Sequence, residues 1–518
     1  MTARPPAQGV AALADRPADP RRAALVVGVC ALIATAAARP IADAIYDTAN
    51  EPPAVLEAIR RLRDRSAPVV GVRRAAVVVL VDGLRADEAD RMPVLRRLRA
   101  TVRARLRVDL PTLSRVAYHT LFTGAPPSAT GVRSNRFSGH ARLDSLADRA
   151  REAGGHVTWI AAGNDWLARM FARPSDTDAH RPDALGAPLD AALAAMNAHG
   201  GRPSLTVVHV LEVDRAGHAS GVRGEARRRA VVRADRVIER VARAAERSGA
   251  IVVVLADHGH IDVGGHGGDE PEVQSISFVA RVPPSPGRRL GRPLRAAEVA
   301  PTLAAWMGMA PPRTATAFAV PELVGQLPAT DAGRRSMLVA SSDRALELRL
   351  EQRRIGLCAI VVLAALMALG AIKRAFGFDR ATAIGPVVTA ATVIAVHVGA
   401  WQRPLTASAI DDIDRYGPLV AGLGAFAALA GILMALAARG GAGTWRATAR
   451  RASAACALGA VASAGFAIAW CGGALGPWAL SAYASHAPIL LCIVGAGVCA
   501  SSGVVLLASR LGERTLAH

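Results

Sequence analysis

Four short apolar runs constrain the fold of this chain more than any other feature. Each is rich in valine or other apolar residues and ends at a polar residue or glycine. They read AAVVVLVDG from Ala75, GHVTWIAAGN from Gly155, SLTVVHVLEVD from Ser204 and AIVVVLADHG from Ala250. Continuous apolar runs of this length are typical of strands buried on both faces of a parallel sheet. The chain is therefore expected to fold around such a sheet.

Alanine-, leucine- and arginine-rich stretches with helical spacing lie between these runs. Two examples are DEADRMPVLRRLRATVRARL from Asp87 and EARRRAVVRADRVIERVARAAERSG from Glu225. We interpret their arginines as the solvated faces of helices. Because strand and helix alternate, we predict an α/β fold with a mostly parallel sheet flanked by helices.

Six further apolar stretches have the length that crosses a bilayer, roughly 20 residues. They are Ala23–Ile41, Ile355–Ile372, Ala381–Trp401, Pro418–Ala438, Ala452–Trp470 and Pro488–Ser509. We therefore predict a cytoplasmic tail at 1–22 and a transmembrane helix or signal anchor at 23–41. An extracytoplasmic domain at 42–351 and a five-helix transmembrane domain at 352–518 follow.

Basic residues orient these helices. They precede the first stretch and lie between the second and third and between the fourth and fifth, whereas the other loops are poor in positive charge. The positive-inside rule then puts both termini in the cytoplasm of a multi-pass protein of the cell (inner) membrane. The domain at 42–351 would face outward, which in a bacterium is the periplasm.

The net charge of +20 does not predict nucleic-acid binding. Lys373 is the only lysine, so the arginine excess resembles a coding bias, and no recognition module accompanies it. All six cysteines fall in or beside apolar stretches, which leaves the outward domain without a disulfide framework. That domain must instead be stabilised by its own core.

Acidic residues and histidines follow three of the four runs. Asp82 follows the first run, Asp214 and His218 follow the third, and Asp257 and His258 follow the fourth. The carboxyl ends of parallel strands meet at one edge, where open α/β sheets place their sites. His266, beyond a glycine-rich loop, can fold back onto that edge. Aspartate with histidine suits zinc, or manganese or another first-row ion.

The order of these motifs resembles the alkaline phosphatase superfamily. Aspartate after the first strand, a hydroxyl residue, D-x-x-x-H, D-H-G and a further histidine follow one another in that order. Within the superfamily, the chain is most similar to type I phosphodiesterases/nucleotide pyrophosphatases and GPI ethanolamine phosphate transferases. DHGHIDVGGHGG resembles the transferases' D-H-G-M-x-x-x-G-x-H-G, and PTLSR resembles their P-T-x-S-R. The resemblance spans residues 75–312.

The resemblance implies two divalent metal ions, expected to be zinc, and a hydroxyl nucleophile. One ion would be held by Asp214, His218 and His266. The second would be held by Asp82, Asp257, His258 and the nucleophile. Ser114 matches the nucleophile, and Thr112 is its rival because PTLSR contains both hydroxyls. Arg85 and His119 are candidates to face the substrate, whereas His260 and Asp262 are expected to orient ligands.

The implied function is a membrane-anchored phosphodiesterase or phosphotransferase that acts through phosphoserine. Its partners would be the membrane and a phosphodiester substrate, expected to be lipid or lipid-linked, with phosphoethanolamine-type transfer as one form of the reaction. The phosphodiesterases' Asn, three residues after the nucleophile, is Ala117 here, which favours the transferase-like branch. Hydrolysis of nucleotides or other soluble diesters is an alternative. A transporter or scaffold with a vestigial metal-binding domain is another.

Overall fold

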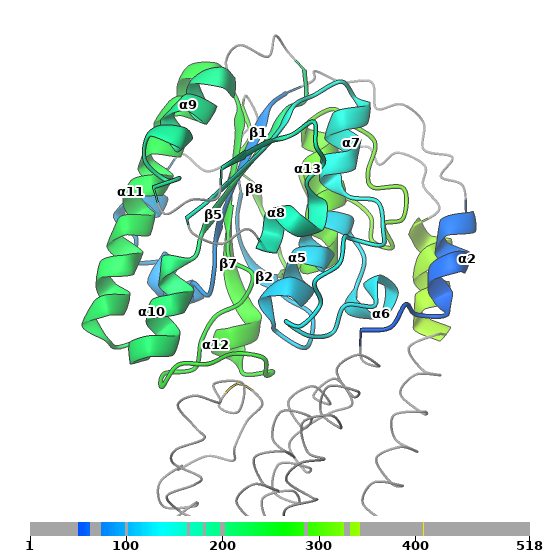
Figure 1. The fold of residues 1–518 in the computed structure, drawn as a ribbon, viewed down its shortest axis with the longest axis horizontal. Helices are drawn as coiled ribbons and strands as arrows, with labels where there is room; N and C mark the ends of the chain where they lie inside the picture. Colours follow the sequence, from blue (N-terminus) through cyan, green and yellow to red (C-terminus); the bar gives the residue numbers. More distant parts are fainter. Residues whose placement is uncertain are drawn as a thin grey trace, which may run out of the picture.

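A nine-stranded sheet forms the centre of the computed structural model (Figure 1). The structure describes residues 50–62, 74–98, 102–162, 166–179, 183–196, 202–283, 288–325 and 332–341, together with Ser408. The strands are β1 (Ala76–Val81), β2 (Val102–Arg107), β3 (Val157–Ala161), β4 (Thr177–Ala179), β5 (Leu205–Val210), β6 (Ile251–Leu255), β7 (Ser275–Arg281), β8 (Arg288–Arg289) and β9 (Leu294–Arg295). Their order is β4-β3-β5-β1-β6-β7-β2-β8, and β9 pairs with β2.

The four apolar runs form β1, β3, β5 and β6, as predicted. In each of these strands every residue is buried, and the strands pair in parallel. Ala76 at the start of β1 aligns with Leu205 on one side and Ile251 on the other. The carboxyl ends of β5, β1 and β6 therefore lie side by side. Only β7 runs antiparallel to its described neighbours, so the prediction of a mostly parallel α/β sheet is confirmed.

The prediction of a helical stretch from Asp87 was wrong over its second half. Two short helices, α3 (Ala86–Ala89) and α4 (Pro93–Arg97), are followed by β2. In β2 apolar residues alternate with arginines. Val102 and Leu106 are buried, whereas the three arginines of the strand are exposed. This period of two belongs to a strand with one face in the core. Pairing with β7 stabilises it as such.

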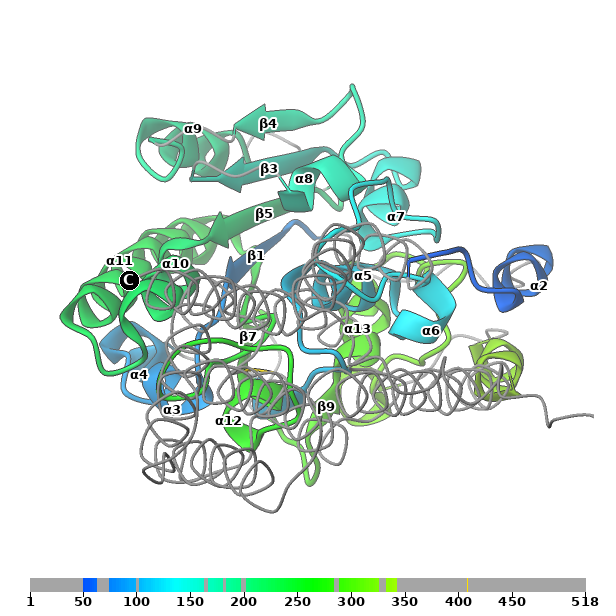
Figure 2. The ribbon, with the colours of Figure 1, turned by 60° about the horizontal axis from the view of Figure 1, so that its bottom comes forward.

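Helices cover both faces of the sheet (Figure 1, Figure 2). On one face lie α9 (Ala187–Met196), α10 (Glu212–Ser220) and α11 (Glu225–Ser248), and on the other lie α5 (Ser114–Thr123), α7 (Leu146–Glu152), α8 (Trp166–Phe171) and α13 (Val299–Trp306). The second predicted helical stretch is α11. It buries an apolar stripe, including Ile238 and Val241, and exposes most of its arginines.

Several shorter elements complete the described chain. They are α2 (Val55–Arg61), α6 (Pro127–Thr130), α12 (Pro271–Gln274), a 3-10 turn (Ala296–Glu298) and α14 (Pro321–Val324). Residues 332–341 are helical as well. Val339 from that helix packs with Ile59 of α2 and Ala129 of α6 in a small apolar cluster apart from the main core.

The predicted membrane segments lie outside the described residues. Among the residues that are described, no helix combines the length and apolar character needed to cross a membrane. Both the segment at 23–41 and the five segments of 352–518 therefore stay predictions. Ser408, from the loop expected between the third and fourth stretches, is the one residue of 352–518 that the structure describes.

Candidate active site

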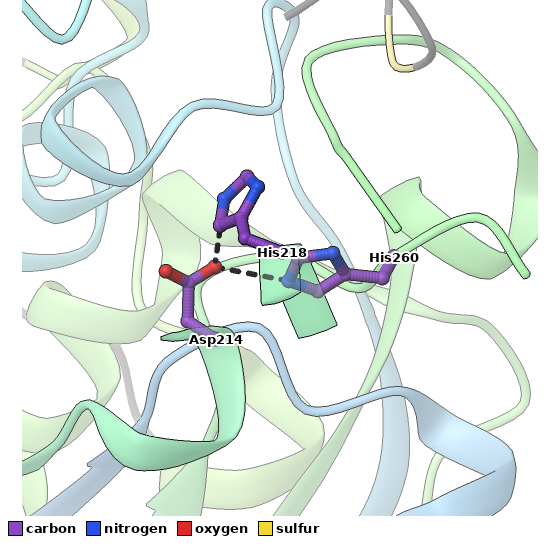
Figure 3. Close-up of side chains that lie close together, drawn as sticks. All are labelled: Asp214, His218 and His260. Carbon is purple, nitrogen blue, oxygen red and sulfur yellow. Dashed lines mark hydrogen bonds and ion pairs between the residues drawn. The ribbon is translucent and has the colours of Figure 1, made fainter. Parts of the chain in front are cut away.

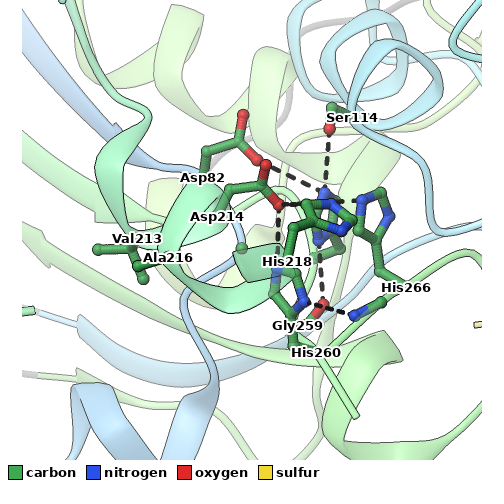
Figure 4. A network of polar contacts seen from close by, with 12 residues as sticks. Asp82, Ser114, Val213, Asp214, Ala216, His218, Gly259, His260 and His266 are labelled. Carbon is green, nitrogen blue, oxygen red and sulfur yellow. Dashed lines mark hydrogen bonds and ion pairs between the residues drawn. The ribbon is translucent and has the colours of Figure 1, made fainter. Parts of the chain in front are cut away.

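Three neighbouring parallel strands deliver the acidic residues of the site, and Figure 4 shows two of these residues, Asp82 and Asp214. Asp82 directly follows β1, and its N–H donates to the Val210 carbonyl at 2.9 Å, which holds it beside the end of β5. Asp214 lies in the first turn of α10, which follows β5. Asp257 lies just beyond β6, next to His258. The order β5-β1-β6 thus gathers all three carboxylates at one edge.

His258 lies at the centre of one group of side chains. Its Nε2 is 3.3 Å from Asp257 Oδ2, 3.5 Å from Asp82 Oδ1 and 3.0 Å from Ser114 Oγ. Its Nδ1 lies 3.0 Å from the Gly259 carbonyl, which can only accept a hydrogen bond, so Nδ1 carries the proton. Nε2 therefore presents a lone pair. The structure brings together the four residues expected around the nucleophile's metal.

Asp214 lies at the centre of a second group (Figure 3). Its Oδ1 is 3.5 Å from His218 Nε2, 2.9 Å from His260 Nε2 and 3.8 Å from His266 Nε2. The expected ligands His218 and His266 are thus near Asp214, and His260 is nearer still. The rings of His258 and His266 stack with centroids 3.7 Å apart, which places the two groups side by side.

The hydrogen bond at the second ring nitrogen, Nδ1, distinguishes the roles of His260 and His266. His266 Nδ1 lies 2.9 Å from the Thr112 carbonyl and must donate to it, so its Nε2 presents a lone pair. His260 Nδ1 accepts from the Gly265 N–H at 3.1 Å, so its Nε2 carries the proton and donates to Asp214. Because both of its ring nitrogens are engaged in this way, His260 orients the Asp214 carboxylate and has no lone pair left for a metal ion.

The arrangement fits two divalent cations. Among the described residues, Asp82 Oδ1 and Asp257 Oδ2 are buried carboxylate oxygens without a hydrogen-bond partner. Such oxygens are costly unless a cation or donor satisfies them. Ligand atoms of Asp82, Asp257 and His258 lie within 4.8 Å of one another, as do those of Asp214, His258 and His266. Oxygen and imidazole donors in this mixture suit zinc or a similar first-row ion.

Burial keeps His258 and His266 neutral, which is the form that binds metal. It lowers the pKa of His258 to about 4 and the pKa of His266 to about 3. Burial also raises the pKa of Asp257, and the neighbouring Asp82 carboxylate raises it further. Burial opposes ionisation of Asp82 too, but contacts with His209 and His258 outweigh it and hold the pKa of Asp82 below its usual value.

Two buried residues that the sequence analysis missed hold the other oxygen of Asp82. The Tyr118 hydroxyl donates to Asp82 Oδ2, and His209 Nε2 lies 3.0 Å from the same oxygen. Because both partners contact Oδ2, Oδ1 is left to face His258. An imidazole inside the apolar run SLTVVHVLEVD was the available signal for His209. Tyr118 carried no signal beyond its place four residues after Ser114.

Arg227 also departs from its predicted role. Its side chain is fully buried, although it belongs to α11, whose arginines were expected to be solvated. It donates to both carboxylate oxygens of Glu88, at 3.0 and 2.7 Å. It also donates to the carbonyls of Gly83 and Val213 at 2.7 and 2.8 Å. Because these carbonyls belong to the neighbours of Asp82 and Asp214, Arg227 connects the backbone beside Asp82 to the backbone beside Asp214.

The structure separates the two candidate nucleophiles. The Thr112 hydroxyl donates to the Gly268 carbonyl at 2.8 Å and accepts from the Gly267 N–H at 2.9 Å, and the residue is fully buried. Ser114 is the first residue of α5 and is half-buried, with its hydroxyl directed to His258. The geometry therefore favours Ser114 as the nucleophile, and Thr112 holds the loop after His266.

Neither candidate substrate residue is brought into the metal cluster. His119 is fully buried, contacts the rings of Phe137 and Phe171, and lies with Nδ1 2.6 Å from the carbonyl of its own helix at Arg115. Burial lowers the pKa of His119 to about 4, so it stays neutral. Arg85 pairs instead with Asp87 at 2.9 Å and with Asp262 at 2.7 Å.

Asn135 is a further polar residue near the nucleophile that the sequence analysis missed. Its Oδ1 accepts from the N–H of Arg115 at 3.1 Å, one residue after Ser114. The carboxamide therefore caps the N-terminus of α5 beside the nucleophile. Ala117, which departs from the family's asparagine, is buried within the same helix. The segment GVRSNRF that carries Asn135 showed no motif of its own.

Comparison with known proteins gives one sequence family and several structures. Residues 76–272 match the family model of type I phosphodiesterase / nucleotide pyrophosphatase. No curated protein matches the chain. An alkaline phosphatase superfamily protein from Vibrio parahaemolyticus is similar in structure, with TM-score 0.39 and 18% identity over 52% of this chain and 74% of that one. Two phosphonate monoester hydrolases are similar too. The one from Silicibacter pomeroyi has TM-score 0.37 and 16% identity over 50% of this chain and 78% of that one. The one from Agrobacterium radiobacter has TM-score 0.37 and 15% identity over 49% of this chain and 77% of that one.

Proposed function

We propose a reaction through a phosphoserine at Ser114, because residues 76–272 match the family model of type I phosphodiesterase / nucleotide pyrophosphatase. The chain is a metal-dependent phosphoester hydrolase or transferase of the alkaline phosphatase superfamily. Its finer assignment is a membrane-anchored two-metal phosphodiesterase or phosphotransferase. The substrate is a phosphodiester on a lipid or lipid-linked glycan, and transfer of phosphoethanolamine is one form of the reaction.

One observation carries the proposal. Ser114 Oγ lies 3.0 Å from His258 Nε2, which presents a lone pair. The unpartnered oxygens of Asp82 and Asp257 lie 3.5 and 3.3 Å from the same nitrogen. A hydroxyl beside a buried cation-binding set has the arrangement of an activated nucleophile. The first turn of α5, where Ser114 lies, adds the positive end of a helix dipole.

The residues support a two-step phosphoryl transfer. In the first step Ser114 Oγ forms a bond to phosphorus as the bond to the leaving alcohol breaks, and the hydroxyl proton ends on that alcohol. In the second step water or an acceptor alcohol attacks the phosphoserine, and Ser114 regains its proton. Tyr118 and His209 hold Asp82 in place through both steps. Arg227 does the same for the backbone beside Asp82 and Asp214.

The proposed ligand sets are Asp82, Asp257, His258 and Ser114 for one ion, and Asp214, His218 and His266 for the other. When bound, divalent ions lower the pKa of the hydroxyl and offset the charge of the phosphate. His260 acts on the second set through Asp214 and contributes no lone pair.

A pair of serine and threonine variants tests the nucleophile. Ser114→Ala removes Oγ and should abolish turnover of a nitrophenyl phosphodiester by the purified full-length protein. Thr112→Val keeps the shape of the side chain and removes the hydroxyl that holds the loop, so it should weaken activity without abolishing it. Full activity of Ser114→Ala would refute the assignment.

Metal analysis tests the ligand sets separately. Asp257→Ala should lower the content of bound zinc or manganese relative to the wild type, measured by elemental analysis of the purified protein. Unchanged metal content in this variant would show that the site is drawn wrongly. Purified Ser114→Ala should keep most of its metal, because Asp82, Asp257 and His258 remain to hold the ion beside the nucleophile.

Hydrolysis of soluble diesters is the second candidate, and the name of the matched family supports it. The two reactions differ in the final acceptor. Assaying the full-length protein with and without phospholipid and candidate acceptor alcohols, and identifying the phosphorylated product by mass spectrometry, separates water from an alcohol. The predicted apolar segments support the membrane reading, because they would keep the site near lipid head groups.

A further inference from the structure

Ser408 contacts the loop that carries His266, although the two residues are far apart in sequence. Ser408 belongs to the segment 352–518, which the sequence analysis interprets as a membrane domain. Its side chain is fully buried. The loop that contains it was expected on the same side of the membrane as the catalytic domain.

The Ser408 hydroxyl holds the backbone at Gly268. It accepts from the Gly268 N–H at 2.8 Å and donates to Glu270 Oε2 at 2.6 Å. On the other side of the same residue, the Gly268 carbonyl accepts from Thr112 Oγ1 at 2.8 Å. A Cβ on Gly268 would lie 2.7 Å from Ser408 Oγ, so the fit leaves no space for a side chain.

This loop in turn fixes a metal ligand. His266 donates from Nδ1 to the Thr112 carbonyl, and the Gly267 N–H donates to the Thr112 hydroxyl. Glycines flank His266 on both sides, and Gly267 has φ of +114°. A glycine-rich segment has many alternative conformations, so its order depends on the groups that hold it. Thr112 holds it from the catalytic domain, and Ser408 holds it from the C-terminal segment.

We propose that Ser408 is a positioning residue for His266, so that a residue far along the chain from the catalytic domain supports the metal site. The inference rests on the proposed function, because it assumes that His266 binds a metal ion. Groups that orient metal ligands typically change metal affinity about 10- to 100-fold when they are removed. Because Ser408 acts on His266 through the loop backbone, the Ser408→Ala variant should bind zinc up to about tenfold more weakly than the wild type.

A serine with the same contacts elsewhere provides the control. Ser145 is fully buried, accepts from the Asp148 N–H at 3.2 Å and donates to Asp148 Oδ2 at 2.7 Å, at the start of α7. Ser145→Ala therefore loses the same kinds of hydrogen bond in the same protein. It should bind zinc as the wild type does, and Ser408→Thr, which keeps the hydroxyl, should restore most of the affinity.

The experiment measures zinc affinity of the full-length protein by competition with a chelator. It also measures hydrogen exchange of the peptide around Gly268 in the metal-free protein, because that exchange reports the loop directly. Exchange there should be faster in Ser408→Ala and unchanged in Ser145→Ala. Wild-type zinc affinity together with wild-type exchange in Ser408→Ala would overturn the inference and leave the proposed function intact. Absence of zinc binding by the wild type would overturn both.

Discussion

Gly83→Ala should damage the metal site through crowding. Gly83 directly follows Asp82 and has φ of +70°, which only glycine adopts readily. A Cβ at this position would lie 2.7 Å from His260 Nε2 and 3.1 Å from Asp214 Cα. Neither neighbour is free to move, because His260 is buried and hydrogen-bonded at both ring nitrogens. The substitution therefore pushes the elements of the two metal groups apart.

The magnitude has two parts. The left-handed backbone costs an alanine about 1–2 kcal/mol in free energy of unfolding. Overpacking a rigid, filled site costs about 1–3 kcal/mol more. Gly249 supplies the matched control, because its φ is +69° and a Cβ there meets nothing within 4 Å. Gly249→Ala should show the first cost alone, and the difference between the two variants isolates the crowding.

Two assays on the purified full-length protein would measure the effect. Urea denaturation of the metal-free protein should show Gly83→Ala to be about 1–3 kcal/mol less stable than Gly249→Ala. Zinc titration should show weaker binding for Gly83→Ala and wild-type binding for Gly249→Ala. Equal losses of stability in the two variants, together with equal zinc affinity, would refute the close packing of Gly83 against His260 and Asp214.

Three other variants test separate features. Tyr118→Phe removes the hydroxyl that donates to Asp82 Oδ2, and zinc affinity should fall about tenfold with the fold intact; unchanged affinity would leave His209 as the sufficient support. Asn135→Ala removes the cap beside Ser114, and kcat/KM for a phosphodiester should fall, whereas a loss of stability alone would limit Asn135 to capping. His119→Phe should reduce the acid sensitivity of folding. Burial lowers the pKa of His119 from 6.5 to about 4, so unfolding takes up a proton between these pH values. The free energy of unfolding is therefore unaffected by His119 above pH 6.5 and falls by up to about 3 kcal/mol as the pH approaches 4. Urea midpoints at pH 6.5 and pH 4 should differ less in the variant than in the wild type, and an equal difference would contradict the role of His119.

The central sheet and the clustering of the candidate metal-binding residues at one edge were predictable from sequence because both depend on local pattern. A continuous apolar run identifies a strand buried on both faces, and parallel strands bring their carboxyl ends to one edge whatever the rest of the chain does. Asp82 and Asp257 follow two such runs directly. Strand β2 was missed because its arginines were interpreted as the exposed face of a helix. Their alternation with Val102, Ala104 and Leu106 was the local evidence for a strand.

The supporting residues were not predictable because their partners are remote in sequence. Arg227 resembles any other arginine of an amphipathic helix until Glu88, 139 positions earlier, is folded against it. Removing either partner would leave the other charge buried and unpaired, which costs far more than losing a surface ion pair. The spacing of residues within α11 does not predict this pairing. The same holds for Tyr118 and His209, which meet only at Asp82.

The histidines of the glycine-rich loop show most clearly where residue type stops being informative. His258, His260 and His266 are chemically identical, and ligand atoms of all three lie within reach of Asp214 or Asp257. What separates them is the partner of the second ring nitrogen. A backbone carbonyl forces a proton onto Nδ1 of His258 and of His266 and leaves a lone pair on Nε2. A backbone N–H at Gly265 does the reverse for His260, which must then donate to Asp214. The proposed division into ligands and an orienting residue therefore follows from the backbone conformation of the loop, which its glycines permit.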